Sequence, residues 1–247
     1  MLPLKRITFS YDDGVTQDIR CIEILNRYGL KATFNLNSGL LGTETELDVC
    51  GVRVRHCKVR PDEVADIYRT HEVAVHTLTH PNLTLLTDGE VLAQVCGDAD
   101  TLERLVGYPM AGMAYPMGGV NQNAHIAALI RDNTRLRYAR TLISSYGFGS
   151  GGDPMQFHPT VYHMEWEKML QLSDQFLALQ PEQPQLLYLW GHTYELDATG
   201  RWDAFERFCA HIAGRDDVLY CTNREALLGM PPPQAVFSRP EASKINE

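Results

Sequence analysis

The 247-residue sequence lacks an excess of basic residues and has no long, uninterrupted hydrophobic run. Its 31 acidic residues outnumber its 22 lysines and arginines, so the formal net charge is −9 and no cationic stretch suits a phosphate backbone. We therefore expect no nucleic-acid partner. No stretch is long enough to span a bilayer, and no apolar leader precedes the first predicted strand. These absences predict a cytoplasmic protein with no membrane partner.

The sequence also has few cysteines and no nucleotide-binding glycine motif. Its six cysteines are scattered without a C-x-x-C pair, and a chain of this size has no need of disulfides, so we expect free thiols. Cys50 and Cys57 are near enough in sequence to pair across a hairpin, but the expected compartment favours their reduced state. No G-x-G-x-x-G follows the first predicted strand, which disfavours a dinucleotide-binding sheet.

What the chain does contain is an alternation of predicted strands and helices. The apolar patterns predict strands at 5–11, 30–36, 72–75, 113–115, 137–143, 185–190 and 218–221. Helices are predicted at 17–28, 61–70, 88–106, 123–132, 165–179 and 201–213, with a last one from 223. Such alternation implies parallel strands joined by helical crossovers. We therefore predict an α/β fold, an irregular (β/α)7 barrel of parallel strands ringed by helices.

Two segments interrupt this alternation, and a third ends it. Residues 38–60 predict an inserted hairpin, and residues 144–163 form a glycine-rich loop. Three consecutive prolines begin at position 231, where an extended tail is expected. We predict one barrel domain over residues 1–230 and a C-terminal tail over residues 231–247.

Carboxylates and imidazoles stand at the ends of predicted strands. Asp12 and Asp13 end the first strand, while His76 and His80 follow another. One carboxylate and two imidazoles can hold a divalent cation with coordination positions left open, and a second carboxylate can take a proton from water. In parallel barrels such residues meet at the carboxyl ends of the strands, where His192 is also expected. Each of these motifs alone is weak evidence for a site; Asp-Asp-Gly, for example, often forms a plain turn.

Four motifs, in this order, together resemble those of the polysaccharide deacetylase family, also called carbohydrate esterase family 4. They are Tyr11-Asp12-Asp13-Gly14, His76-Thr77-Leu78-Thr79-His80, Ala114-Tyr115-Pro116-Met117-Gly118 and Trp190-Gly191-His192. The similarity runs from about residue 5 to about residue 225. It implies a metal-dependent hydrolase that removes acetyl groups from an N- or O-acetylated sugar or oligosaccharide, or from another small amide.

The resemblance also implies a role for each motif. It makes Asp12 the catalytic base and His192 the general acid. It assigns the metal to Asp13, His76 and His80, and this ligand set suits zinc most often, with cobalt, nickel or iron as alternatives. The Met117 N–H would stabilise the oxyanion. Substrate-binding and oxyanion positions would then be Tyr115, Met117 and Trp190.

Two motifs depart from the family pattern. Ala114 stands where the family usually has the arginine that tethers the base, and Arg140 could either replace that arginine or form a surface salt bridge. Trp190 stands where a leucine usually lines the acetyl pocket, which predicts a narrower or reshaped pocket. The carboxylate that orients His192 has three candidates, Asp153, Glu165 and Glu195.

The same sequence features leave two other functions and six further histidines to consider. The same fold and metal could instead open a cyclic amide or imide, since a fold does not fix its chemistry. A catalytically silent carbohydrate-binding protein is disfavoured, because it has no use for an unpaired base beside a cation. The remaining histidines are expected to be structural or exposed, with the two in the glycine-rich loop as the first exceptions: His56, His71, His125, His158, His163 and His211.

Overall fold

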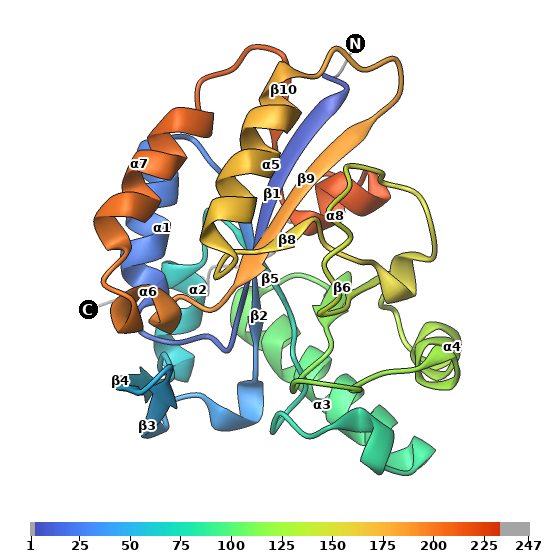
Figure 1. Cartoon of the computed structure of the whole chain (residues 1–247). Helices are drawn as coiled ribbons and strands as arrows, with labels where there is room; N and C mark the ends of the chain where they lie inside the picture. The colour runs from blue at the N-terminus through green and yellow to red at the C-terminus, as the bar shows by residue number, and fades with distance from the viewer. Residues whose placement is uncertain (1–2, 233–247) are drawn as a thin grey trace, which may run out of the picture.

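Eight parallel strands form a sheet that curls into a barrel in the computed structural model, which describes residues 3–232 (Figure 1). The strands follow the order β7-β6-β5-β2-β1-β9-β8, and β10 pairs with the first half of β1. Their bounds are β1 (Lys5–Asp12), β2 (Ala32–Leu36), β5 (Glu72–Val75), β6 (Gly112–Ala114), β7 (Tyr138–Arg140), β8 (Val161–Tyr162), β9 (Gln185–Gly191) and β10 (Val218–Tyr220). The predicted parallel barrel is confirmed.

The barrel closes irregularly at one seam. A single parallel bridge joins Arg140 of β7 to Phe157, in the segment that leads into β8. β8 itself is only two residues long, and it lies inside the segment predicted as a glycine-rich loop. The sheet therefore has one strand more than predicted, because two residues are too few to show an apolar pattern.

Helices surround the sheet on its outer face, with α1, α5 and α7 on one side of β1 and β9 (Figure 1). The helices are α1 (Asp18–Arg27), α2 (Val64–Ile67), α3 (Asp88–Val106), α4 (Ala124–Asn133), α5 (Trp166–Ala178), α6 (Tyr194–Ala198), α7 (Trp202–Ile212) and α8 (Asn223–Leu228). Short 3-10 turns lie at Ser38–Leu40, Pro61–Glu63, Leu83–Leu85 and Pro154–Gln156. None of the helices in residues 3–232 has the length and hydropathy needed to cross a membrane.

The main hydrophobic core lies between the strands and these helices, while the barrel interior combines polar side chains with a smaller apolar cluster that includes Leu186, Tyr188 and Trp190 of β9. Alternate residues of β1 show the division, because Phe9 and Tyr11 join the main apolar cluster whereas Thr8 and Ser10 bond to polar groups of other elements. At the amino end of the barrel, buried Glu72 accepts hydrogen bonds from polar groups of β2, β7 and α8. The strands thus deliver polar side chains to the opposite, carboxyl end.

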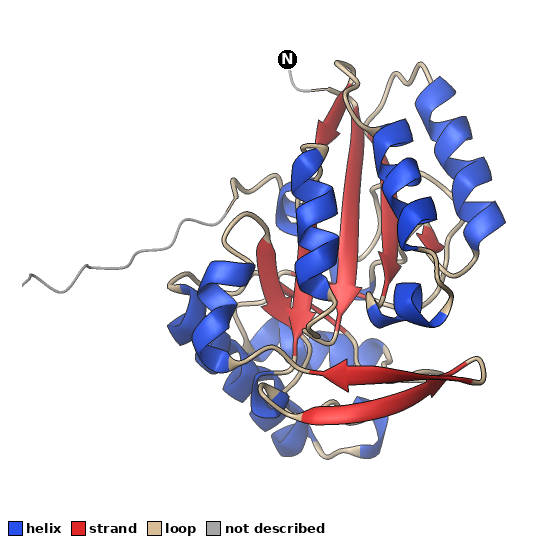
Figure 2. Ribbon diagram, turned by 90° about the vertical axis from the view of Figure 1, so that its left-hand side faces the viewer, coloured by secondary structure: helices blue, strands red, loops and turns tan. Residues whose placement is uncertain are grey.

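The predicted inserted hairpin is confirmed as β3 (Glu44–Val49) and β4 (Val52–Cys57), which cross below the strands in Figure 2. Cys50 and Gly51 form its two-residue turn with φ values of 54° and 81°, as a type I′ turn requires. Cys50 therefore lies at the tip and Cys57 at the base, so they do not pair. All six cysteines are free thiols.

Residues 3–230 all belong to the barrel, its helices and the hairpin. Of the predicted tail, only residues 231 and 232 are described, and residues 233–247 lie outside the described part of the chain. The proposed boundary at 230 therefore stays a prediction.

We predict that His71 makes the protein less stable in acid. Its imidazole is buried, its Nδ1 accepts the Ala32 N–H at 3.1 Å, and burial lowers its pKa from 6.5 to about 3. A depressed histidine pKa stabilises the fold above pH 6.5, and this contribution is lost as the pH falls toward 3. Urea unfolding at pH 7 and at pH 4.5 gives the unfolding free energy lost on acidification. This loss should be about 2.5 kcal/mol smaller in His71→Asn, which keeps a hydrogen-bond acceptor, than in the wild type. An equal loss in both proteins would contradict it.

Candidate active site

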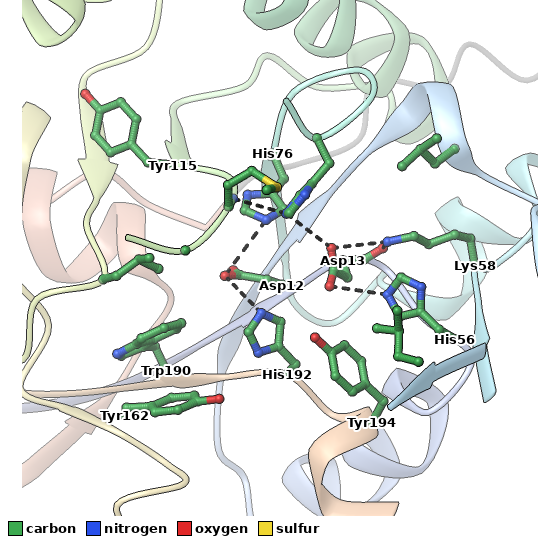
Figure 3. Close-up of a pocket in the computed structure, with 16 residues that line it drawn as sticks. Asp12, Asp13, His56, Lys58, His76, Tyr115, Tyr162, Trp190, His192 and Tyr194 are labelled. Carbon is green, nitrogen blue, oxygen red and sulfur yellow. Dashed lines mark hydrogen bonds and ion pairs between the residues drawn. The ribbon is translucent and has the colours of Figure 1, made fainter. Parts of the chain in front are cut away.

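The residues singled out in the sequence converge on one cavity at the carboxyl ends of the strands (Figure 3). Asp12 ends β1, His76 directly follows β5, and His192 directly follows β9. The cavity has a volume of about 470 Å³, and Asp13, His80, Met117 and Trp190 also line it. The predicted clustering of these side chains is therefore what the fold produces.

Asp13, His76 and His80 form a group that fits a divalent cation. One ligand atom from each residue lies within 4.8 Å of the others. The His76 Nδ1–H donates to the Ala114 carbonyl oxygen at 2.8 Å, so its Nε2 is the free nitrogen on the cation side. One carboxylate with two imidazoles is a donor set that zinc and neighbouring transition metals accept.

Four residues of this site hold backbone conformations that side chains rarely adopt. The φ values are 86° at Asp13, 71° at Thr77, 60° at His80 and 68° at Met117. Such conformations cost of order 1–3 kcal/mol each and persist only where the surroundings impose them. The local backbone is thus shaped to present the ligands and the Met117 amide.

Buried Asp98 on α3 supports the His76 loop. Its two carboxylate oxygens accept the backbone N–H of Ser38 at 2.7 Å and the backbone N–H of His76 at 2.9 Å. Burial outweighs these bonds and raises the pKa of Asp98 to about 7. The sequence offered no sign of this residue's role.

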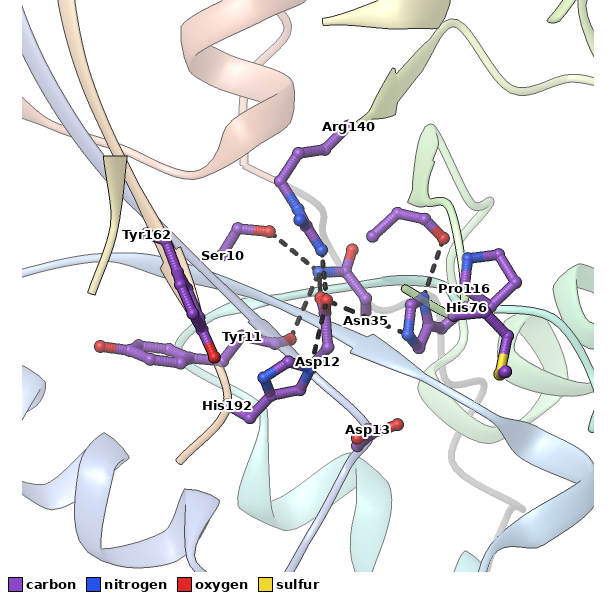
Figure 4. A network of polar contacts seen from close by, with 12 residues as sticks. Ser10, Tyr11, Asp12, Asp13, Asn35, His76, Pro116, Arg140, Tyr162 and His192 are labelled. Atoms are coloured by element: carbon purple, nitrogen blue, oxygen red, sulfur yellow. Dashed lines mark hydrogen bonds and ion pairs between the residues drawn. The ribbon is translucent and has the colours of Figure 1, made fainter. Parts of the chain in front are cut away.

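Asp12 lies at the centre of a buried polar network (Figure 4). Asn35 donates to its Oδ1 at 2.8 Å, and Arg140 donates to its Oδ2. Burial favours the neutral acid, but the Arg140 guanidinium, together with His76 and His192, lowers the pKa of Asp12 overall. A carboxylate therefore persists here at neutral pH.

Arg140 is fully buried, so the surface salt bridge considered for it is wrong. Its guanidinium lies 4.4 Å from the centre of the Trp190 ring, and Tyr162 stacks on that ring with the two ring centres 4.4 Å apart. Trp190 thus covers the ion pair of Arg140 with Asp12 as well as lining the cavity. The large Trp190 ring therefore shields this ion pair in addition to shaping the cavity.

Glu195 is the carboxylate beside His192. Its Oε2 accepts the His192 backbone N–H at 2.9 Å and lies 3.2 Å from the His192 Nδ1, while the His192 Nε2 lies 4.0 Å from the Asp12 Oδ2. Burial alone would lower the pKa of His192, but Glu195 raises it to about 9. The other two candidates serve elsewhere, since Asp153 pairs with Arg131 and Glu165 accepts from Tyr146.

Two predicted residues occupy less direct places. The Met117 N–H lies beside the cation group, where it donates to the His80 Nε2 at 3.4 Å, and its role as an oxyanion donor stays a prediction. Tyr115 lines the cavity, but its buried hydroxyl donates to the Met155 carbonyl oxygen at 2.8 Å. That bond leaves the Tyr115 hydroxyl engaged with the protein rather than turned to a substrate.

Several other residues at the site were not predicted from the sequence. His56 was expected to be structural or exposed, yet it lines the cavity with its Nε2 at 3.3 Å from the Asp13 Oδ2. Lys58 also comes from the base of the hairpin, and its Nζ lies 3.2 Å from the Asp13 Oδ1. Of the other histidines, His163 donates to Glu195 at 2.7 Å. His71 is buried in the fold, and outside the cavity lie His125, His158 and His211.

Solved structures with this fold are known from fungi and bacteria. A chitin deacetylase from Colletotrichum lindemuthianum is 16% identical with a TM-score of 0.58, and the alignment covers 95% of this chain and 93% of that one. A peptidoglycan deacetylase from Bacillus subtilis is 18% identical with a TM-score of 0.53, covering 90% and 89%. A pseudoenzyme of carbohydrate esterase family 4 from Bacillus anthracis is 15% identical with a TM-score of 0.52, covering 90% and 65%. At these identities the likeness shows the fold.

The sequence itself carries the family signature. No curated protein sequence matches this chain. The family model described as polysaccharide deacetylase, however, matches residues 2–133, which is more than half of the chain and includes the first three of the four motifs. The chain therefore belongs to the polysaccharide deacetylase family.

Proposed function

We propose that the protein is a metal-dependent hydrolase that removes acetyl groups from an N- or O-acetylated sugar or oligosaccharide. The observation that carries the proposal is the grouping of Asp13, His76 and His80 beside an ionised Asp12, with His192 4.0 Å from that carboxylate. Family membership supports a hydrolase of acetylated sugar polymers. Two structures of the same fold come from proteins named for chitin and for peptidoglycan deacetylation.

A divalent cation at this group would polarise the acyl carbonyl and lower the pKa of the attacking water. Asp12, kept ionised by Arg140, receives the proton of that water. The Met117 N–H lies beside His80 of the cation group and would stabilise negative charge on the carbonyl oxygen. His192, held as an imidazolium by Glu195, then gives its proton to the departing amine or alcohol.

The structure bears on the two competing functions. Two departures, the missing motif arginine and Trp190, left cyclic amides open. Arg140 pairs with Asp12 and Trp190 packs on that arginine, so both departures are compatible with a supported base. A silent binding protein would not need Asp12, the cation group and His192 in one cavity. Acetyl hydrolysis is therefore the reaction that the geometry supports best.

Zinc is the cation that we propose, with cobalt, nickel and iron as alternatives. Free cysteines agree with a reducing compartment, so we also propose a cytoplasmic location.

We predict that purified protein contains about one divalent ion per chain and loses its activity in chelator. Acetate release from N-acetylglucosamine oligomers should stop after chelation and return with zinc or cobalt. Asp13→Ala removes the only carboxylate of the cation group and should lose both metal, by elemental analysis, and acetate release. Acetate release that persists in the metal-free protein would contradict the proposed function.

Arg140→Met should cost both stability and activity. Removing one partner of a buried ion pair leaves Asp12 unpaired, which costs about 3–5 kcal/mol in unfolding free energy or protonates the base. Acetate release should fall at least about 100-fold. As a control, Arg131→Met breaks an exposed pair with Asp153 and should change unfolding by less than about 1 kcal/mol. Full activity in Arg140→Met would remove Arg140 from the site.

Glu195→Gln should keep the metal but slow the reaction. Without the carboxylate, burial lowers the pKa of His192 from about 9, so less imidazolium is present at neutral pH. We expect kcat to fall about 10- to 100-fold and the alkaline limb of the pH–rate profile to move to lower pH. Glu165→Gln, which changes a carboxylate away from His192, is the matched control. An unmoved alkaline limb in Glu195→Gln would contradict the assignment.

A further inference from the structure

The inserted hairpin reaches the carboxylate that we assign to the metal. Two residues at the end of the hairpin, His56 and Lys58, contact the same side chain, Asp13, from the side away from His192 (Figure 3). Neither residue belongs to the four motifs. The hairpin therefore does more than interrupt the alternation of strands and helices.

His56 binds the carboxylate oxygen that faces away from the other ligands. Its Nε2 lies 3.3 Å from the Asp13 Oδ2, whereas the Asp13 Oδ1 lies 3.7 Å from the His80 Nε2. An ionised carboxylate can only accept, so the His56 Nε2 carries the proton of this hydrogen bond. The imidazole also packs edge-on against the Tyr194 ring, with ring centres 5.1 Å apart, and its Nδ1 lies 3.2 Å from the Thr45 Oγ1.

Lys58 fixes the backbone that carries this carboxylate. Lys58 is only 4% exposed, and its ammonium group donates to the Asp13 carbonyl oxygen at 2.6 Å and to the Asn37 Oδ1 at 3.2 Å. These bonds hold Asp13 in its unfavourable conformation, with φ at 86°. The base of the hairpin is further tied to this loop by the Thr16 N–H, which donates to the Cys57 carbonyl oxygen at 2.8 Å.

We infer that His56 is a positioning residue of the metal site. It occupies the Asp13 Oδ2, so that Asp13 offers its Oδ1 to the cation, in an orientation set by the hairpin. The Lys58 Nζ, also from the base of the hairpin, lies 3.2 Å from that Oδ1 and shares it. Loss of a partner that orients a metal ligand in this way typically lowers metal affinity about 10- to 100-fold. The inference rests on the proposed function, because it assumes the cation group of Asp13, His76 and His80.

The test compares metal affinity among three variants of the full chain. Competition with a chelator gives the Kd for zinc and cobalt, and urea unfolding of the metal-free proteins checks that each variant folds. His56→Leu keeps the packing on Tyr194 but removes the donor, and it should weaken both ions about 10- to 100-fold. His56→Gln keeps an amide donor and should stay within about threefold of the wild type. His125→Leu changes an exposed histidine paired with Asp88 and should have no effect.

The outcomes separate this inference from the proposed function. Wild-type affinity in a folded His56→Leu protein, with tight binding abolished in Asp13→Ala, would overturn the role of His56 alone. A loss of more than about 1,000-fold with an altered cobalt absorption spectrum would also overturn it, since His56 would then be a direct ligand. A folded wild-type protein that binds neither ion would overturn the proposed function and this inference with it.

Discussion

The site depends on one constraint, which is that a carboxylate inside a barrel must be kept charged. Asp12 meets it through Arg140, which is itself buried and pairs with the Asp12 Oδ2, and through Asn35, which bonds the Oδ1. The Trp190 ring of β9 then covers the guanidinium, and Tyr162 of β8 stacks on the Trp190 ring. The base, its counter-ion and the aromatic cover come from β1, β7 and β9, so the whole curvature of the sheet is needed to assemble them.

The placement of the apolar residues leaves room inside the barrel for these buried charged groups. The main hydrophobic core lies outside the barrel, between the strands and the helices, and leaves room in the interior for polar side chains beside a smaller apolar cluster on β9. The base and the acid then receive separate supports, Arg140 for Asp12 and Glu195 for His192, and these push the two groups toward opposite protonation states. A carboxylate ready to accept a proton and an imidazolium ready to donate one can therefore share one cavity.

Much of this could be predicted from the sequence, for identifiable reasons. Residues 7–11 alternate apolar with polar side chains, and residues 186–190 form an apolar run, so both read as strands and the polar residues that follow them were recognisable as the strand ends. Arg140 was found because it stands in a predicted strand. Glu195 could have been ranked first by its closeness in sequence, since it lies only three residues after His192.

The rest depended on contacts that leave no local pattern. β8 is defined by its pairing with Leu189 and Trp190 rather than by its own two residues. His56 lies 43 positions from Asp13, on a hairpin strand whose other side chains mostly face solvent. The residues next to it in the sequence show no pattern that points to a functional site. Trp190 could be read as a wall of the cavity, but its contact with Arg140 required the register of β9.

The most direct test of the account is a crystal structure of the zinc-loaded protein with anomalous diffraction at the zinc edge. We predict one peak in the cavity, about 2.0–2.2 Å from the Asp13 Oδ1 and from the Nε2 atoms of His76 and His80, with Asp12 still paired with Arg140 and off the metal. Density without such a peak, or with Asp12 bound to the ion in place of Asp13, would contradict it.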